Sequence, residues 1–367
     1  MKHVNIVIVG AGIAGSILAA QLPDHLSIMV LDKKRLDGHP DSFKKPCGGL
    51  IAPDAQRSLA KLGLTIPKDV LASPQIFSVT TVDLPARLTR HYQRFYLNVH
   101  RHKLDIWLAS LIPERVEVMD QSMVTKIQPH DDYVDIEYHR NQTAHHIRCD
   151  YCIGADGAKS ITRGATHAPK IRQYMAIQHH FPRHNTQPFL GCFFDESITD
   201  SYGWFDVKDD VLKLGAALPL TDSLKRFEQL KSSLLTMGYP LNQPIYKEAC
   251  LVNSPKSLHE IYLGEKRILL IGEAAGWISP SSLEGLSYAI DSAIIASKAL
   301  VQHDPLASYI HLARPLKVKI KLKQWKSLVL YTPLFRRWVM RSGLSSIQKI
   351  KESVDSLHIV HGKAGKK

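Results

Sequence analysis

The chain has 367 residues, enough to bury a large core in one or two domains, and its 44% hydrophobic and 22% charged content is ordinary for a globular enzyme. No apolar stretch reaches the length of a membrane-spanning helix and no signal peptide is visible, so we expect a cytoplasmic protein. The net charge of +13 is uneven: eleven Lys and Arg but no Asp or Glu lie between Arg314 and Lys351.

The chain opens with a strand, a glycine turn and a helix. The apolar, β-branched run 4–9 predicts a buried parallel strand, and a glycine-rich turn and a helix follow it. Gly10 permits the tight turn, Gly12 lets backbone N–H groups approach a pyrophosphate, and Gly15 lets helix and strand pack closely. We therefore predict a dinucleotide site that includes Gly10, Ala11, Gly12, Ala14 and Gly15.

A second strand, predicted over 27–31, ends at an acidic residue. Asp32 lies 22 residues after Gly10, near the spacing expected for a carboxylate that accepts a ribose hydroxyl. Lys33 follows it and is included in the predicted cofactor site. A plain βαβ unit is the alternative for the turn alone, but strand, helix and acid together favour dinucleotide binding.

The middle of the chain contains two sheet-forming regions and a second glycine turn. Residues 74–98 alternate like sheet, 101–111 predict a helix, and 116–153 predict several strands. Gly154-Ala155-Asp156-Gly157 follows the last of these strands, and Asp156 can hold a loop near the pyrophosphate while Gly157 permits close approach. Strand patterns at 174–181, 189–195, 202–207 and 211–218 predict an antiparallel sheet over a substrate cavity.

A third glycine segment follows a buried strand at 267–272. The carboxylate of Glu273, after Gly272, can accept hydrogen bonds from ribityl hydroxyls, although most FAD enzymes of this type carry Asp there. Gly285 and Leu286 open a helix predicted over 286–301, whose N-terminal dipole would stabilise negative charge on a reduced flavin. The three segments in this order predict an FAD cradle.

These elements predict an α/β fold in which two domains are interleaved. A Rossmann-like FAD-binding domain comprises 1–73, 99–171 and 260–304, and an antiparallel β-sheet substrate domain comprises 74–98 and 172–259. Residues 305–367 form a basic helical C-terminal segment, broken at Pro315 and Pro333. No metal site is expected, because Cys149 and Cys152 lie on a predicted strand where residues three apart face opposite ways.

The C-terminal segment interleaves aromatic and aliphatic residues with its positive charges. It is either a surface element for anionic membrane, which would place the protein peripherally at the inner membrane face, or a helical layer packed on the core with lysines in solvent. No nucleic-acid-binding motif accompanies the charge, so nucleic acid is not an expected partner.

Several motifs resemble the geranylgeranyl reductase family of flavoproteins over nearly the whole chain. They are 45–50, 51–57, 197–200, 270–287 with its Glu273 variant, and 338–343. The resemblance implies hydride transfer from reduced FAD to a double bond of an apolar, isoprenoid-like substrate. It also implies that Pro46, Cys47, Gly48 and Gly49 lie beside the isoalloxazine ring, Arg101 near the phosphates, and the Val124 backbone near adenine.

Two features of the resemblance leave the chemistry open. Cys47 could donate a proton or tune the flavin, or it could be a packing residue. Tyr202, Trp204 and Phe205 correspond to a strand that lines the family's lipid cavity, but Asp206 replaces the usual proline after them. They could equally be the aromatic core of a sheet.

A reductase is thus the leading interpretation, with an FAD monooxygenase as the alternative and a flavin-bound membrane-associated binding or stress protein as a third. The chain has no second dinucleotide motif, so the electron donor would be transiently bound NAD(P)H or a redox protein. The sequence leaves the oligomeric state open.

Overall fold

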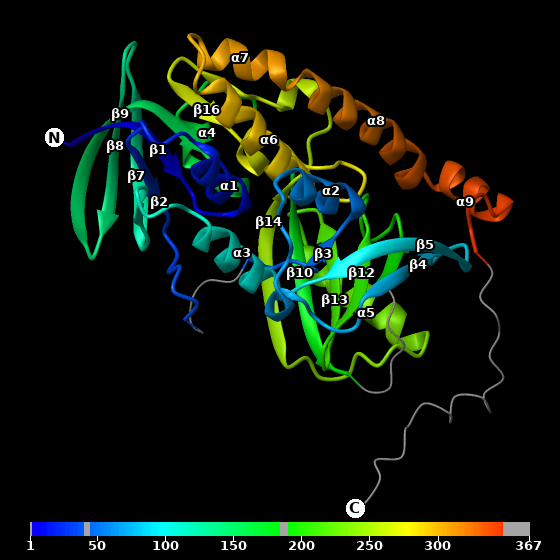
Figure 1. Ribbon diagram of the computed structural model, residues 1–367. Helices are drawn as coiled ribbons and strands as arrows, with labels where there is room; N and C mark the ends of the chain where they lie inside the picture. The colour runs from blue at the N-terminus through cyan, green and yellow to red at the C-terminus, as the bar shows by residue number, and fades with distance from the viewer. Residues whose placement is uncertain (1, 40–44, 184–189, 348–367) are drawn as a thin grey trace, which may run out of the picture.

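The computed structural model describes residues 2–39, 45–183 and 190–347. Two eight-stranded sheets lie side by side, and helices cross over the first sheet and continue along one edge of the molecule (Figure 1). The predicted two-sheet α/β fold is confirmed.

The first sheet has a mainly parallel centre with the strand order β15-β16-β9-β1-β2-β6, and a meander of β7 and β8 is attached to β9. The parallel strands at the centre of the sheet, β1, β2, β9 and β16, bury residues on both faces toward their carboxyl ends, as is typical of parallel sheets. The strands are β1 (Lys2–Val9), β2 (Ile28–Leu31), β6 (Glu117–Met119), β7 (Ser122–Pro129), β8 (Val134–Arg140), β9 (Thr143–Gly154), β15 (Gly264–Glu265) and β16 (Ile268–Leu270).

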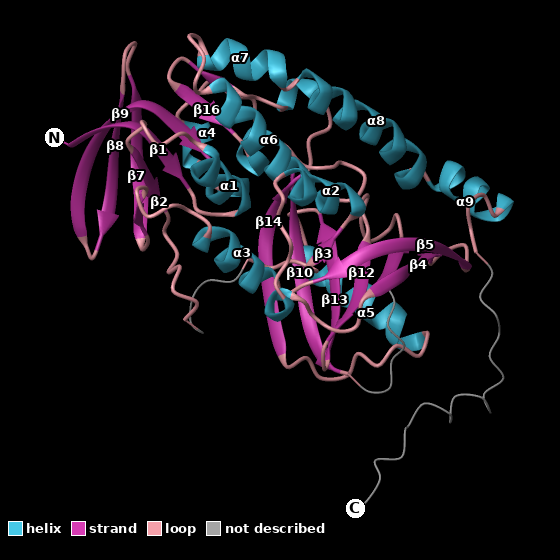
Figure 2. Ribbon diagram, in the orientation of Figure 1, coloured by secondary structure: helices cyan, strands magenta, loops and turns pink. Residues whose placement is uncertain are grey.

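Helices α1 and α6 pack on this sheet and on each other, as the helix layer in Figure 2 shows. The sequence predicted α1, α3 and α6 but missed α2, which begins at Pro53 and packs on α6. The helices are α1 (Ile13–Gln21), α2 (Pro53–Lys61), α3 (Arg101–Ser110), α4 (Ile161–Gly164) and α6 (Leu286–Ala299), and short 3-10 turns occupy η1 (Lys68–Val70), η2 (Gly157–Lys159), η3 (Leu258–Glu260) and η4 (Gly272–Ala275).

The second sheet has the order β14-β10-β13-β12-β11-β4-β5-β3 and is antiparallel except for the pair β11 and β4. Its strands come from the regions predicted for the substrate domain, apart from β3, which the sequence placed in the FAD-binding domain and which pairs with β5. The strands are β3 (Leu50–Ile51), β4 (Ile76–Asp83), β5 (Leu88–Asn98), β10 (Gln173–Pro182), β11 (Leu190–Phe194), β12 (Gly203–Lys208), β13 (Val211–Leu218) and β14 (Tyr246–Asn253).

The two faces of the second sheet differ in chemistry. Helix α5 (Ser223–Thr236) covers one face, where Phe181, Phe205, Leu214 and Phe227 are fully buried in one apolar cluster. The opposite face contacts the first domain, through Lys213 among others. Because successive strand residues point to opposite faces, each strand of this sheet supplies both the core and the domain interface.

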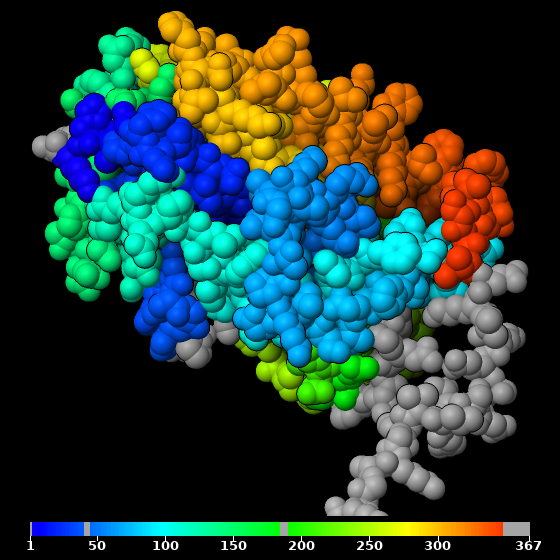
Figure 3. Space-filling view, viewed as in Figure 1, coloured from blue at the N-terminus to red at the C-terminus, as the bar shows by residue number. Residues whose placement is uncertain are grey.

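The C-terminal segment contains α7 (Pro305–Leu312), α8 (Arg314–Tyr331) and α9 (Pro333–Ser342), each with a proline in its first turn. The breaks predicted at Pro315 and Pro333 therefore coincide with the starts of α8 and α9. The three helices follow one another along a single edge of the molecule (Figures 1 and 3). No helix in the described part of the chain is long and apolar enough to span a membrane.

Candidate functional site

The three glycine segments meet at the carboxyl ends of adjacent parallel strands. Gly154, at the end of β9, pairs with Val9 of β1 on one side and with Leu270 of β16 on the other. The Ile271 N–H donates to the Gly154 carbonyl at 2.9 Å, which continues this alignment into the third segment. Ligands of open α/β sheets bind at this edge, so segments more than 100 residues apart form one candidate site.

The glycines of the first turn differ in the space around them. A Cβ on Gly10 would lie 2.7 Å from the Ala155 carbonyl oxygen, and one on Gly15 would lie 1.8 Å from the Gly10 oxygen. Around Gly12, by contrast, a Cβ would meet no atom within 4 Å. Gly12 also precedes α1 without any side-chain cap, so the positive helix end faces open space that a pyrophosphate fits.

Asp32 lies at the end of β2 and braces the glycine turn. Its buried carboxylate accepts the Ala11 N–H at 2.6 Å and the Lys34 N–H at 2.8 Å. A carboxylate has roughly four acceptor positions, so capacity remains for a ribose hydroxyl. The Ser122 N–H donates to the Asp32 carbonyl at 2.8 Å, and the strand that carries Val124 therefore begins beside this acid. Lys33, next in the chain, is exposed.

Asp156 organises the second glycine segment. Its carboxylate accepts hydrogen bonds from the Ser160 hydroxyl and from the Thr162 N–H, and so holds the loop before α4. Burial raises the pKa of Asp156 above its ordinary value. Gly157 has a φ of +75° and open space where a side chain would stand, which leaves this turn accessible to a ligand.

Glu273 connects the third segment to the second sheet. Its carboxylate accepts one hydrogen bond from Lys45 Nζ, at 2.8 Å, and one from the Asn253 N–H, at 2.9 Å. The negative charge of Glu273 raises the pKa of Lys45 above its ordinary value, because its attraction outweighs the opposite effect of burial. The side chain of Glu273, one methylene longer than that of Asp, thus reaches groups outside the glycine turn. Its contact with the ribityl chain stays a prediction.

Glycine also precedes α6. Gly285 is its N-cap residue, and the Glu284 carboxylate accepts the Ser287 N–H at 2.7 Å. Burial raises the pKa of Glu284, as expected for an acid in this environment. The α6 N-terminus therefore carries an acidic cap, while the adjoining Leu286 marks the helix start predicted from the sequence.

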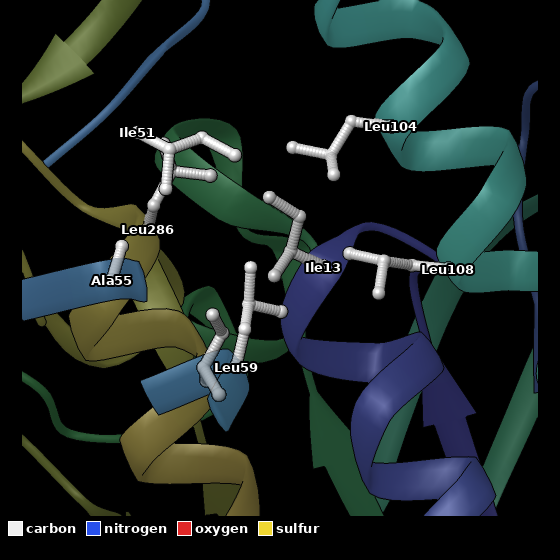
Figure 4. A pocket seen from close by; sticks show the side chains of 8 residues that line it. Ile13, Ile51, Ala55, Leu59, Leu104, Leu108 and Leu286 are labelled. Carbon is white, nitrogen blue, oxygen red and sulfur yellow. The ribbon is translucent and has the colours of Figure 1, made fainter. Parts of the chain in front are cut away.

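Apolar side chains fix the starts of α1 and α6 relative to each other. Ile13 of α1 and Leu286 of α6 line a small apolar cavity of about 10 Å³, together with side chains from β3, α2 and α3 (Figure 4). That volume is roughly one water-sized probe, and the walls offer no polar partner, so the cavity is dry packing. The two glycine-preceded helix ends are held by this packing next to the sheet edge.

The loop that contains Pro46, Cys47, Gly48 and Gly49 lies between α3 and the second sheet. Arg101 Nη1 lies 3.8 Å from Cys47 Sγ, and Lys213 Nζ lies 3.4 Å from the Cys47 carbonyl oxygen. Burial would lower the pKa of Arg101, but Asp105 and Cys47 raise it above its ordinary value. The structure therefore links Arg101 to Cys47 directly, and the predicted contact with phosphate remains untested.

Asp206 is a site candidate that sequence reasoning noted only as a departure from the family pattern. It is fully buried on β12, and neither carboxylate oxygen has a hydrogen-bond partner among the described residues. A Cβ on Gly48 would lie 3.2 Å from Asp206 Oδ2. Burial raises the pKa of Asp206, although Lys213 and Lys208 act in the opposite direction. The available signal was an acid between two apolar residues of a strand, Phe205 and Val207.

Lys208 lies two residues further along β12 and is also buried. Its Nζ donates to Asn98 Oδ1 at 2.6 Å and to the carbonyl oxygens of Val99 and Gly49. Burial lowers the pKa of Lys208 to about 8. The buried amine of Lys208 and the buried carboxyl group of Asp206 thus both lie next to the Gly48–Gly49 turn.

A polar row continues across the same face of the sheet. The Trp204 indole N–H donates to Gln178 Oε1 at 3.0 Å, the Gln178 amide donates to Glu248, and His180 Nε2 lies 2.9 Å from Glu248 Oε1. This face is therefore more polar than the apolar cavity roof that the family resemblance implied. His179, in contrast, lies on the other face with its ring 4.4 Å from that of Phe227, because successive strand residues point to opposite faces.

The three predicted substrate residues do not share one face. Tyr202 and Trp204 lie together, with ring centroids 5.9 Å apart, and the Tyr202 hydroxyl donates to the Ser282 carbonyl at 2.7 Å. Phe205 belongs to the apolar core beneath α5, so its assignment as a substrate-lining residue is corrected. The physical reason is the two-residue period of the strand. Among the described residues no group of His, Cys, Asp and Glu could hold a metal ion.

Comparisons with known proteins agree with this geometry. Residues 3–188 match the family described as FAD binding domain. The chain is 44% identical over 355 residues to protein CbrA of Escherichia coli O157:H7, an alignment that covers 96% of this chain and 100% of that protein.

Two solved structures share the fold. A geranylgeranyl bacteriochlorophyll reductase-like protein from Thermoplasma acidophilum aligns with a TM-score of 0.79 and 18% identity, covering 97% of this chain and 94% of the other. The p-nitrophenol 4-monooxygenase PnpA from Pseudomonas putida DLL-E4 aligns with a TM-score of 0.70 and 16% identity, covering 93% and 94%. At these identities the likeness establishes the architecture alone.

The open space at Gly12 and Gly157, the uncapped start of α1 and the acid at the end of β2 fit FAD. These features lie mainly within the residues that the family match covers. The chain belongs to the FAD-binding-domain family of flavin-dependent oxidoreductases and monooxygenases, and within it to the CbrA proteins.

Proposed function

We propose that the protein is a reductase that saturates a double bond of an isoprenoid-like substrate. The observation that carries this proposal is the buried, unpartnered carboxyl group of Asp206 beside the Cys47–Gly49 loop. Reduced FAD, when bound and regenerated by NAD(P)H or by a redox protein, would supply the hydride to one carbon of the double bond. The other carbon needs a proton, and an acid whose pKa is raised by burial is suited to supply it.

The residues around Asp206 can restore that proton. Lys213 lies between Asp206, its cross-strand neighbour, and the Cys47 carbonyl. His180 and Glu248 follow on the same face and connect this interior to the edge strand β14. Once Asp206 has given its proton to carbon, these groups and water at the sheet edge can return one to it. The Cys47 thiol is the second candidate donor.

The substrate region suits a molecule with an apolar body and a polar end. Trp204, Tyr96 and Cys192 pack together with the apolar cluster around Ile76 and Leu190. Gln178 and its hydrogen-bonded partners lie beside Trp204 and offer polar contacts. We therefore propose that the hydrocarbon part contacts the aromatic side and that a hydroxyl or another polar end group contacts the Gln178 side.

The structural likeness to p-nitrophenol 4-monooxygenase PnpA favours a second candidate, a monooxygenase. In that case oxygen would be consumed and one oxygen atom would enter the product. The third candidate, a flavin-bound binding protein, would retain FAD but give no product. The site chemistry favours the reductase, because saturating a double bond needs a proton donor and Asp206 is a buried carboxyl group beside the Cys47–Gly49 loop.

The test is turnover of geranylgeraniol and geranylgeranyl diphosphate by FAD-loaded, dithionite-reduced protein, with products analysed by mass spectrometry. Without oxygen, we expect product that gains two hydrogen atoms, both of which are deuterium in D2O, because the N5 hydrogen of dithionite-reduced flavin also comes from the solvent. Asp206→Asn should slow product formation at least about tenfold, as loss of a general acid does, while FAD content stays unchanged. Product labelled from ¹⁸O₂, or no product from either substrate, would overturn the proposal.

A further inference from the structure

Helices α8 and α9 present an apolar outer face. Val318, Leu322 and Trp325 recur at spacings of four and three residues, which places them on one side of α8. Leu334, Phe335 and Trp338 extend this side on α9. All six side chains are more than half exposed, with Trp325 at 67% and Trp338 at 70%. We call these six residues the outer face.

Packing on the core uses the other side of the two helices. Leu316 and Ile320 of α8 and Met340 of α9 are buried. The aromatic residues noted from the sequence are therefore largely absent from the contact with the body of the protein. This distribution argues against the interpretation in which the C-terminal segment only covers the core, since a covering helix exposes its polar side.

The basic residues of the segment fall into two groups. Lys319 and Lys323 point inward to Asp54 Oδ2, at 3.4 and 3.7 Å, and Arg337 pairs with Asp83. Arg314, Lys317 and Lys321 flank the outer face, and within the described part of the chain they form no ion pair. No acid occurs between Arg314 and Lys351, so the outer face is both apolar and positive.

We propose that the outer face docks on an anionic lipid bilayer, with α8 and α9 lying in the plane of the membrane surface. Exposed tryptophan and aliphatic side chains would enter the headgroup region, while the flanking cations attract acidic lipid. A second copy of this chain fits less well, because a symmetric dimer would bring two positive faces together. The charge therefore selects an anionic partner.

The docking face adjoins the substrate region. Tyr331, the last residue of α8, donates its hydroxyl to the Ser281 carbonyl at 3.0 Å, and its ring centroid lies 6.1 Å from that of Phe194. Phe194 in turn lies 6.2 Å from Tyr202, which neighbours Trp204. If the proposed function holds, this aromatic row leads from the membrane to the site. Docking itself does not depend on that function.

The test is sedimentation of the full chain with vesicles of phosphatidylcholine alone or mixed with phosphatidylglycerol. We expect pelleting only with phosphatidylglycerol, a decrease with added NaCl, and a blue shift of tryptophan fluorescence on binding. The triple change Arg314→Gln, Lys317→Gln and Lys321→Gln should weaken partitioning on the order of a hundredfold, from about fivefold per basic residue. Lys319 and Lys323 are left intact because they pair internally.

A matched control removes the same charge elsewhere. Lys126→Gln, Lys225→Gln and Lys247→Gln change three exposed lysines outside α8 and α9 and should leave partitioning within about twofold, since only nearby charge is felt. A second variant, Trp325→Ser with Trp338→Ser, should abolish the blue shift while circular dichroism stays native. Equal loss in both charge variants, binding that resists salt, or sedimentation velocity that shows a dimer abolished by the tryptophan changes would overturn the proposal.

Discussion

The three glycines of the first turn have different physical requirements. Gly10, with a φ of +104°, and Gly15, whose Cβ would overlap the Gly10 oxygen, are fixed by the fold. Gly12 has ordinary dihedral angles, with a φ of −73°, and open space around it. The fold of the turn therefore does not require glycine at this position, and we propose that a ligand approaching the turn does.

We predict that Gly12→Ala keeps the stability of the ligand-free protein and lowers FAD affinity at least about tenfold, or about 1.4 kcal/mol. Isothermal titration of the apoprotein with FAD measures the affinity, and a thermal melt measures the stability. Gly15→Ala is the matched control: it should destabilise the fold itself by about 1–3 kcal/mol or more. Unchanged FAD affinity in Gly12→Ala would mean that the pyrophosphate does not lie against this turn.

Lys208 makes a pH-dependent contribution to stability. Burial lowers its pKa in the folded protein to about 8, whereas an unfolded chain has a value near 10.4. Between these values the unfolded chain binds more protons, so the free energy of unfolding contributed by this group rises with pH. Below pH 8 the cost of burying the charge is fully present.

Accordingly, the stability difference between the parent protein and Lys208→Met should change between about pH 8 and pH 10, by up to about 3 kcal/mol in favour of the parent at high pH. Urea unfolding of both proteins at several pH values measures this difference. The other titratable groups are common to both proteins, so their contributions cancel in the difference. A difference that stays constant across the range would show that Lys208 keeps an ordinary pKa.

Single contacts between distant residues were beyond sequence reasoning. The position of Asp206 beside Gly48 joins residues 158 positions apart and depends on how a loop meets a sheet. The sequence could mark Asp206 only as an unusual residue in an apolar strand. The inward position of Phe205, by contrast, follows from its alternation with Trp204, so the two-residue period was a usable signal.

At the scale of elements, the sequence predicted most of what has a strong local signal. The run of apolar residues in β1, the glycine turn and the proline starts of α8 and α9 are local patterns, and the structure has them there. Helix α5 was missed because it lies inside a strand-rich region, although Phe227, Leu230 and Leu234 recur at helical spacing. Pairings such as β11 with β4 bring together segments more than 100 residues apart and have no local signal.

The docking of α9 depends on one buried acid. Asp83 is fully buried at the end of β4, and Arg336 Nε donates to it at 2.8 Å while Arg337 Nε donates at 3.1 Å. Burial alone would raise the pKa of Asp83, but the arginines and the Ala86 N–H more than offset this and lower it. The contribution to stability is therefore present above the ordinary pKa of an aspartate and is lost as pH falls below it.

We predict that Asp83→Asn costs about 3 kcal/mol, because Arg336 is left buried with a weaker partner. Hydrogen exchange of residues 333–342 should speed up more than that of α7, which has no contact with Asp83. The pair of the exposed Arg57 with the half-buried Asp54, 3.5 Å apart, is the control: Arg57→Gln should cost less than about 1 kcal/mol. Unaltered exchange in α9 would show that other contacts hold this helix.

At the scale of the whole molecule, the loop with Cys47 is where the two domains meet. Lys213 of the second sheet contacts the Cys47 carbonyl, Cys250 Sγ lies 3.8 Å from the Pro46 carbonyl, and Lys45 pairs with Glu273. The third glycine segment adjoins this loop through Glu273, whereas the first glycine turn contacts Asp32 at the end of β2. A ligand as long as FAD would touch both regions, whereas its adenine half would reach only the first.

We therefore predict that FAD protects both sheets from hydrogen exchange, whereas ADP protects only the first. Hydrogen exchange measures the free energy of opening each part of the structure. At a concentration one hundred times its Kd, either ligand should raise this free energy by about 2.7 kcal/mol wherever opening releases the ligand. With FAD, slower exchange is expected in β1, in the 45–51 loop and in β10; with ADP, β10 should exchange as in the free protein. Because both ligands are used at the same multiple of their own Kd, a difference in affinity cannot cause a difference between their exchange patterns. The same pattern with both ligands would mean that the flavin end does not reach the Cys47 loop, and the reductase proposal would then lose its link between Asp206 and the reacting bond.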